Sequence, residues 1–527
     1  MNALLVLYSG NLSDEAFEPV FEGKNSVFLA IERAKMFPGV KKTVLFTCAD
    51  IDLNGITGVE VEKADSVLKS WTKQSLLERI SVHQAGFDCV YFAFADCPFL
   101  DPALAGALVR RHLENKAEYS YADGWPYGLA PEMLAPGTAG ILAKIVKDDG
   151  PVERDILFSV IQKDINAFDI EAEISSVDLR CHRLSLCADS KRNLLLLSNF
   201  IGAAGGKIPG AGETERLIQM HPEILRTLPC FFPIQVSGGC PQNCSLCPYT
   251  SVTEPTARKD FMDSGKFESL LDKISAFCGD AVIDLSLWGE PSLHPEKLKL
   301  IEAVLSRSEL SLIIETSGIG WKTVELEKIA GMSADFSLNK RKNRLTPLSW
   351  IVSLDTTDPS RYAQMRGQGF AEANDCAKKL LSLFPKNCYV QAVRTAGSEE
   401  DTEKFYRFWK DAAGGESNII IQKYDDFCGA LEKRQASDIS PLTRQPCWHI
   451  MRDMVILLDG TAPVCREDLS ILKGEKNNIL GNVFTGSLES IWQNGEPRYL
   501  EQCKKNYSGT DDMGLCANCD EYYTYNF

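Results

Sequence analysis

The sequence lacks any apolar run that approaches the roughly 20 residues needed to cross a bilayer. It also lacks an excess of cations: 56 Lys and Arg stand against 72 Asp and Glu, a formal net charge of −16. That balance argues against a nucleic-acid partner held through its phosphates. The apolar start, residues 1–8, has no basic segment before it, so we interpret it as a first strand rather than a signal peptide. We therefore expect a cytoplasmic protein with neither a membrane nor a nucleic-acid partner.

Cysteine, in contrast, is abundant, with 18 residues among 527. In a chain of cytosolic appearance this favours thiolate or metal chemistry over disulfides. Cys240, Cys244 and Cys247 form a C-x3-C-x2-C pattern. Closely spaced soft sulfur ligands are typical of zinc or an iron–sulfur cluster. Because structural zinc usually takes four protein ligands, three thiols in one loop leave a coordination position for another group.

Residues 1–200 predict a first domain of α/β type. Short apolar runs of strand type lie at Ala3–Tyr8, Thr43–Thr47 and Cys89–Ala95. They alternate with helical patterns such as Ser26–Lys35 and Pro102–Glu114. This alternation indicates a parallel, doubly wound sheet, which binds ligands beyond the carboxyl ends of its strands. Asp96 follows such an end, where a carboxylate could hold a hard cation and a phosphate or cap the next helix.

This segment resembles the sugar-nucleotidyltransferases of the GT-A (Rossmann-like) fold. The matching motifs are Gly23-Lys-Asn25, Ala95–Pro102, Asp123–Gly128 and Asp169–Glu173. The resemblance implies Mg²⁺ and a nucleotide as ligands. Where the family has a glycine-rich basic loop after the first strand, residues 9–18 are acidic and nearly free of glycine. Few backbone amides would face a phosphate there. A working transferase, a non-catalytic module that binds a nucleotide or a partner, and a degenerate scaffold all stay open.

Residues 201–229 predict a linker followed by a helix. The segment Gly202–Gly212 is rich in glycine and alanine, which favours a flexible connection. Residues 213–228 have helical periodicity.

Residues 230–432 predict a partial (β/α)6 barrel. Six runs of strand type alternate with helical patterns, and the runs are Phe231–Val236, Ala281–Leu287, Leu310–Glu315, Trp350–Leu354, Cys388–Val393 and Asn418–Gln422. In such barrels the chemistry collects at the carboxyl ends of the strands. Polar residues cluster after several of these strands, and the three-cysteine loop follows the first.

This second domain resembles the radical S-adenosylmethionine (SAM) enzymes. The resemblance implies that Cys240, Cys244 and Cys247 hold a [4Fe–4S] cluster whose fourth iron binds SAM. It further implies that the motif Gly289, Glu290 and Pro291 contacts the SAM amino group. By position after later strands, Ser317, Ser353 and Arg394 would hold the ribose or the carboxylate of SAM. The expected chemistry is reductive cleavage of SAM to a 5′-deoxyadenosyl radical, which takes a hydrogen atom from the substrate.

Residues 433–527 contain four more candidate ligands: Cys447, Cys465, Cys516 and Cys519. Their spacing alone leaves zinc and an iron–sulfur cluster open. The segment resembles the SPASM/twitch extension of radical SAM enzymes, which implies one auxiliary [4Fe–4S] cluster. Four thiolates would ligate it fully, favouring an electron-transfer or structural role. Other cysteines are expected to be buried small residues: Cys230, Cys278, Cys376, Cys388 and Cys428.

The whole arrangement resembles the spiro-SPASM family. The leading hypothesis is a radical SAM oxidoreductase that oxidises a small substrate, with the auxiliary cluster as electron acceptor. The first domain hints at a sugar- or nucleotide-linked substrate. The alternative is a maturase that modifies peptides or proteins. Either activity implies an external one-electron reductant of the flavodoxin or ferredoxin type.

Overall fold

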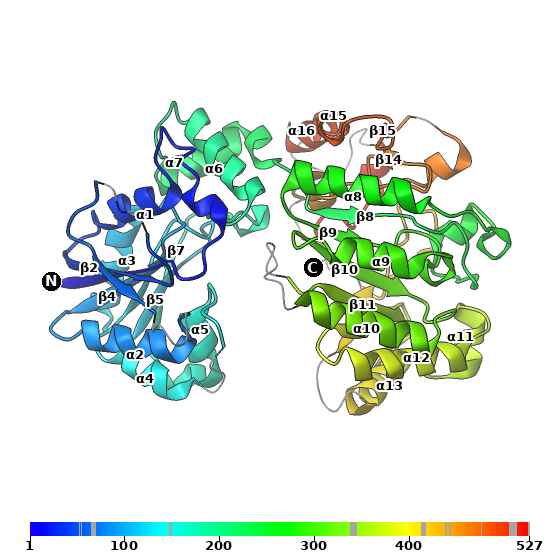
Figure 1. Cartoon of the computed structure of the whole chain (residues 1–527), viewed down its shortest axis with the longest axis horizontal. Coiled ribbons are helices and arrows are strands. Elements are labelled where there is room, and N and C mark those ends of the chain that lie inside the picture. The colour runs from blue at the N-terminus through cyan, green and yellow to red at the C-terminus, as the bar shows by residue number, and fades with distance from the viewer. Residues whose placement is uncertain are drawn as a thin grey trace. The chain divides into compact units, whose positions relative to one another are not determined.

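The structure is a computed structural model. It describes residues 1–527 except 52, 54, 65–69, 147–149, 338–344, 413–417, 438–439, 442–443, 476, 505–513 and 525–527. The chain divides into two compact units, Met1–Thr227 and Leu228–Phe527 (Figure 1). A search of the described residues finds no helix with the length and apolar character that crossing a membrane requires.

The first unit is built on a mixed sheet with the strand order β3-β2-β1-β4-β6-β5-β7 among the described residues. Its strands are β1 (Ala3–Tyr8), β2 (Val40–Thr47), β3 (Glu60–Lys63), β4 (Cys89–Phe94), β5 (Tyr119–Asp123), β6 (Glu132–Leu134) and β7 (Ile170–Ile174). All neighbours pair in parallel except β6, which runs antiparallel to β4 and β5. Every residue of β1 and β4 is buried, as expected for central parallel strands. The predicted α/β sheet is confirmed.

Several helices of the first unit begin at side-chain caps that the sequence supplies. The α-helices among the described residues of this unit are α1 (Ser26–Ala34), α2 (Lys73–His83), α3 (Pro102–Glu114), α4 (Thr138–Ile145), α5 (Ile156–Ile161), α6 (Lys191–Ala203) and α7 (Ala211–Met220). Asn25 accepts from the Phe28 amide at the start of α1, and Asp101 accepts from Ala103 and Leu104 at the start of α3. Such caps satisfy amides that have no partner within the helix.

The segment predicted as a linker, residues 201–229, differs from expectation. Up to Thr227 it belongs to the first unit. The Ala211 amide, at the start of α7, donates to the second carboxylate oxygen of Asp101 at 2.7 Å. One aspartate therefore caps two helices, so α7 is packed on the first unit instead of following a free connection.

The second unit contains a parallel six-stranded sheet in which neighbouring strands follow chain order. The strands are β8 (Phe231–Pro233), β9 (Ala281–Asp284), β10 (Leu310–Thr316), β11 (Leu348–Ser353), β12 (Cys388–Arg394) and β13 (Ile419–Lys423). Figure 1 shows helices in a row over this sheet, and they are α8 (Ser264–Cys278), α9 (Lys297–Leu305), α10 (Thr323–Ser337), α11 (Pro359–Met365), α12 (Phe370–Leu383) and α13 (Glu399–Ala412). The predicted partial barrel is confirmed.

The C-terminal part extends the free edge of β8. The Met454 and Ile456 amides donate to the carbonyls of Phe231 and Pro233, which continues the parallel pairing. Beyond this edge lie the antiparallel pair β14 (Thr461–Pro463) and β15 (Ile479–Asn482), with helices α14 (Trp448–Arg452), α15 (Leu488–Gln493) and α16 (Glu496–Lys504). The described part of this segment therefore shares one core with the half-barrel.

The double cap at Asp101 gives the first prediction. Asp101→Ala removes the acceptor of three backbone amides, and we expect it to lower the free energy of unfolding by about 2 kcal/mol. Asp101→Asn is the matched control. It keeps one oxygen for α3, so it should cost less. Urea unfolding followed by circular dichroism measures both, and an Ala variant as stable as the wild type would contradict the double cap.

Candidate functional site

A cavity of about 240 Å³ lies at the carboxyl ends of the central strands of the half-barrel. It brings together seven of the residues singled out from the sequence: Cys240, Cys244, Cys247, Gly289, Glu290, Ser317 and Ser353. Pro291 starts the short 3-10 turn Pro291–Leu293 and does not line the cavity, nor does Arg394. The cavity is therefore assembled from the cysteine loop and from strand ends far apart in the sequence.

The cysteine loop is held by α11, a helix that the sequence analysis missed. The Ser245 amide donates to the Met365 carbonyl at 2.8 Å, and Gln242 donates to the Tyr362 hydroxyl at 2.7 Å. Arg366, at the end of this helix, donates to Asp355 at 3.0 Å and lines the cavity. The signal was present in the sequence, because Asp358 followed by a proline is a strong start for a short helix.

The three thiols have an environment that fits a metal centre. Burial raises the pKa of Cys240 and Cys244 above the ordinary value and that of Cys247 to about 11. Each thiol would stay protonated at neutral pH without a positive charge to stabilise its thiolate. Arg366 supplies one such charge beside Cys244. Three soft sulfurs that need positive charge match the iron–sulfur cluster expected at this loop.

The Glu290 carboxylate organises the strand ends around the cavity. One oxygen accepts from the Ser292 amide and the Thr316 hydroxyl, and the other accepts from the amide and hydroxyl of Ser317, at 2.6–3.2 Å. Glu290 is only 2% exposed, and burial raises its pKa above the ordinary value in spite of these bonds. The side chain therefore fixes the loops after β9 and β10 relative to each other.

Gly289 allows the backbone to pass close to the cysteine loop. Its φ angle is +98°, and a Cβ atom there would lie 1.9 Å from the Ser237 carbonyl oxygen. The next amide, that of Glu290, donates to the Gly239 carbonyl at 2.7 Å. Only glycine fits this position, which joins the motif after β9 to the loop that contains Cys240.

A second polar group spans the three strands that follow. Glu315 on β10 accepts from Ser353 on β11 and from Gln391 on β12, both at 2.8 Å. Gln391 and Val393 line the cavity, whereas Arg394 is exposed at the end of β12. Side chains alternate along a strand, so Arg394 points away from the face that Gln391 occupies. The structure thus brings Ser353 to the cavity and leaves Arg394 outside it.

The four C-terminal thiols form a second site. Cys447 is buried at 6% exposure, and its amide donates to Gln502, whose own amide group reaches the Cys516 sulfur at 3.5 Å. The Glu467 amide donates to the Cys465 sulfur and the Glu521 amide to the Cys519 sulfur, each at 3.4 Å. Amides that donate to sulfur stabilise thiolates, so this arrangement also fits a bound cluster.

A fifth thiol, Cys428, lies beside this second site. It was expected to be an ordinary buried cysteine, but it is half-buried, and its thiol hydrogen bond lowers the pKa of Cys519. Its backbone adopts a left-handed φ of +57°. Ninety residues separate Cys428 from Cys519, so sequence spacing gave no sign of the contact.

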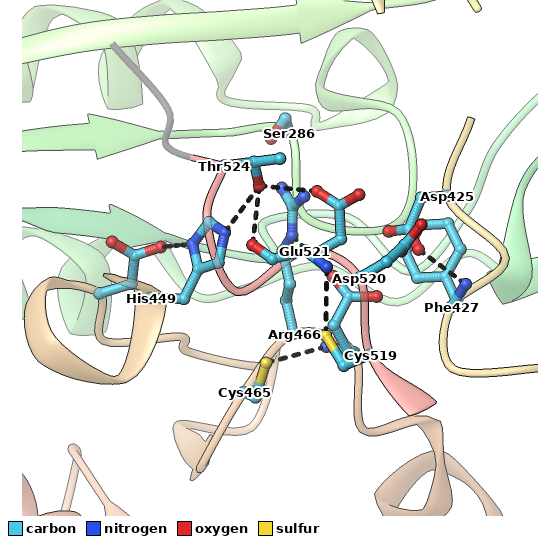
Figure 2. Close-up of polar contacts among 12 residues, drawn as sticks. Ser286, Asp425, Phe427, His449, Cys465, Arg466, Cys519, Asp520, Glu521 and Thr524 are labelled. Atoms are coloured by element: carbon cyan, nitrogen blue, oxygen red, sulfur yellow. Dashed lines mark hydrogen bonds and ion pairs between the residues drawn. The ribbon is translucent and has the colours of Figure 1, made fainter. Parts of the chain in front are cut away.

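Two residues that line the cavity are chain neighbours of cysteines at or beside the second site. Arg466 lines the cavity and directly follows Cys465, and Phe427 lines it and directly precedes Cys428. Figure 2 shows Arg466 with Asp425 and Glu521 beside Cys465 and Cys519. Burial raises the pKa of Asp425 to about 9, with added repulsion from Glu467. The cavity lining is therefore joined through the chain to residues of the second site, and charged side chains lie at this junction.

In the first unit, Asp96 lies where the nucleotidyltransferase resemblance places a cation. It is fully buried, and both of its oxygens accept from Arg154, at 3.1 and 2.6 Å. Arg154 also donates to Asp189 at 3.0 Å. The guanidinium thus supplies positive charge at the place where Mg²⁺ was expected, so Asp96 does not fit a divalent cation in this arrangement.

Comparison with known families agrees with this picture. The family model of SPASM, described as an iron-sulfur cluster-binding domain, matches residues 447–520. A three-cysteine loop at the mouth of a parallel half-barrel, followed by a SPASM domain, defines a radical SAM protein. The cofactors of this class are a [4Fe–4S] cluster with SAM and an auxiliary iron–sulfur cluster.

More narrowly, the chain belongs to the family of an uncharacterized protein of Treponema pallidum (strain Nichols). The two are 33% identical over 380 residues, which cover 70% of this chain and 98% of that protein. Among solved structures, a cytidylyltransferase of Leptospira borgpetersenii matches 42% of this chain and 95% of its own, with 17% identity and a TM-score of 0.35. Streptococcus suis SuiB bound to the precursor peptide SuiA matches 70% and 84%, with 14% identity and a TM-score of 0.41.

The close approach at Gly289 gives the second prediction. Gly289→Ala should destabilise the second unit by about 2 kcal/mol, because the methyl group would overlap the Ser237 carbonyl and the backbone would be strained. Gly331→Ala in α10 is the control, since no atom lies within 4 Å of the added carbon. Urea unfolding of the anaerobically purified variants measures both, and unchanged stability of Gly289→Ala would contradict the steric argument.

Proposed function

We propose that this protein is a radical SAM oxidoreductase that oxidises a small polar substrate in the cavity of the second unit. The observation that carries the proposal is that Arg466, which lines this cavity, directly follows Cys465 of the four-thiol site. When bound, the first cluster and SAM supply a 5′-deoxyadenosyl radical, which removes a hydrogen atom from the substrate. A net oxidation then requires the loss of one more electron and one proton.

The chain's own residues would have distinct roles at the first cluster. Cys240, Cys244 and Cys247 would hold it, with Arg366 offsetting part of the thiolate charge. Gly289 and Glu290 would shape the surface that receives the SAM amino group, and the four bonds to Glu290 make it a positioning residue in this proposal. Arg366 replaces Arg394 as the proposed cation of the site, because it lines the cavity and Arg394 does not.

Other polar residues of the cavity would orient SAM and the substrate. Ser317 and Ser353 stay proposed contacts to SAM, and the group of Glu315, Ser353 and Gln391 offers both donors and acceptors. Lys423 and Arg466 also line the cavity, and both form ion pairs, Lys423 with Asp520 and Glu521 and Arg466 with Glu467. Such a mixed polar lining favours a substrate with hydroxyl or amino groups, in line with oxidation at an alcohol or amine carbon.

The second site suits a one-electron acceptor for this oxidation. Cys447, Cys465, Cys516 and Cys519 offer four thiolates, which would ligate a cluster fully and leave no open iron for the substrate. Arg466, which lines the cavity, is the chain neighbour of one of these thiols, Cys465. An external reductant would supply the electron that starts each turnover.

For the first unit we propose a non-catalytic binding role. The ion pairs of Arg154 with Asp96 and Asp189 support it, because a transferase of this fold needs a divalent cation near Asp96. The acidic loop at residues 9–18 supports it as well, since a phosphate would meet repulsion there.

Iron content and SAM cleavage test the central proposal. Anaerobic reconstitution should give about 8 Fe per chain from two four-iron clusters. Cys240→Ala should retain about 4 Fe and form no 5′-deoxyadenosine with dithionite and SAM, because only the first cluster is lost. Cys447→Ala should lose the other cluster. Cys89→Ala, a buried thiol of the first unit, is the control and should lose neither. A wild-type chain with about 4 Fe and bound zinc would refute the auxiliary cluster.

The role of the first unit is tested by nucleotide titration. Isothermal titration of the full chain with CTP and UTP should show no increase in affinity when Mg²⁺ is added, because Arg154 already neutralises Asp96. No pyrophosphate should form with sugar phosphates as acceptors. Strong Mg²⁺-dependent binding together with pyrophosphate release would establish a working transferase and overturn the binding role.

A further inference from the structure

The first unit contains a cavity of about 550 Å³ that no step of the proposed reaction uses. It lies beside the ends of β5 and β6 and is lined by five aromatic side chains: Tyr119, Tyr121, Trp125, Tyr127 and Phe158. Tyr119 stacks on Tyr121 with ring centroids 5.7 Å apart and on Phe158 at 6.4 Å. The faces of aromatic rings carry partial negative charge, which attracts cations.

Carboxylates add to the negative character of this cavity. Glu132 and Asp155 line it, and Arg154, the one guanidinium in its lining, already faces Asp96 and Asp189. The lining thus contains two carboxylates and one guanidinium, and that guanidinium is already paired with two further carboxylates. An anion such as a phosphate would meet net repulsion here, whereas a cation would meet net attraction.

Two polar groups in the cavity could interact with a bound ligand, one as a carboxylate and one as a hydrogen-bond donor. The Glu132 carboxylate accepts a hydrogen bond from the Tyr119 hydroxyl, but no Lys or Arg of the described residues forms an ion pair with it. The indole N–H of Trp125 is buried and has no acceptor within the described part of the chain. A buried carboxylate without a cation and a buried donor without an acceptor are both costly.

From this geometry we infer that the cavity binds a small organic cation that also carries an oxygen acceptor, such as the amino alcohol choline. The aromatic faces and Glu132 would surround the ammonium group, and the Trp125 N–H would donate to the oxygen. The inference rests on the proposed binding role of the first unit and names its class of ligand.

The titration of Glu132 makes the inference testable by pH. Burial raises the pKa of Glu132 to about 7, and the charge of Asp155 adds to the shift. The other charged or titratable groups facing it are Tyr119, Tyr127 and Arg154. A bound cation favours the ionised carboxylate, so affinity should rise with pH and be about tenfold higher at pH 8 than at pH 6.

The experiment compares choline with its neutral isostere 3,3-dimethylbutan-1-ol, by isothermal titration and tryptophan fluorescence on the full chain. Choline should bind about tenfold more tightly than the isostere, because the two differ only in charge. Glu132→Gln should abolish that preference and the pH dependence. Glu171→Gln, a carboxylate of β7 outside the cavity lining, should keep both.

Equal binding of the two probes by the wild type, or no binding of choline, would overturn the inference without any variant. If Glu132→Gln unfolds, the comparison of probes and the pH series on the wild type still decide. A Mg²⁺-dependent transfer reaction in the titration described above would instead refute the non-catalytic role, so the two failures are distinguishable.

Discussion

The mouth of the half-barrel depends on a buried carboxylate whose acceptor positions are filled. Glu290 is 2% exposed and accepts four hydrogen bonds from three residues on two loops. A carboxylate in so dry a place is tolerated only when its oxygens are satisfied, so the loops after β9 and β10 must hold this one geometry. The turn that contains Glu290 also fixes the positions of Gly289 and of the cysteine loop. The hydrogen bonds of Glu290 therefore set the shape of this part of the cavity.

In the first unit a buried carboxylate has the opposite consequence for the binding of a charged ligand. There Asp96 is also buried, but its oxygens accept hydrogen bonds from the guanidinium of Arg154 rather than from neutral donors. Neutral donors leave the surrounding space available for a charged ligand, whereas a bidentate ion pair satisfies the carboxylate and discourages a second cation. The carboxylate beside the central strand β4 of this unit is therefore occupied by the chain's own guanidinium.

Much of the fold could be predicted from the sequence, because its parallel strands are short, apolar and regularly spaced. The bounds of β1 and α3 agree with the predicted ones to the residue. The thiol spacing likewise indicated both thiol sites. The predictions that failed depended on the direction of a side chain or on contacts between residues far apart in the sequence. Strand alternation turns Arg394 away from the face of Gln391, and helix α11, only seven residues long, was too short for its periodicity to stand out.

The placement of the second site explains why both halves of the second unit share one core. Both segments that link it to the cavity lining are turns: the Asp468 amide donates to the Cys465 carbonyl around Arg466, and Phe427 and Cys428 have left-handed φ angles of +50° and +57°. Each turn brings one residue to the cavity lining and the residue next to it toward the second site. Arg466 lies among the carboxylates of Glu467, Asp425 and Glu521, which raise its pKa above the ordinary value. Its positive charge therefore offsets part of the negative charge beside the thiols.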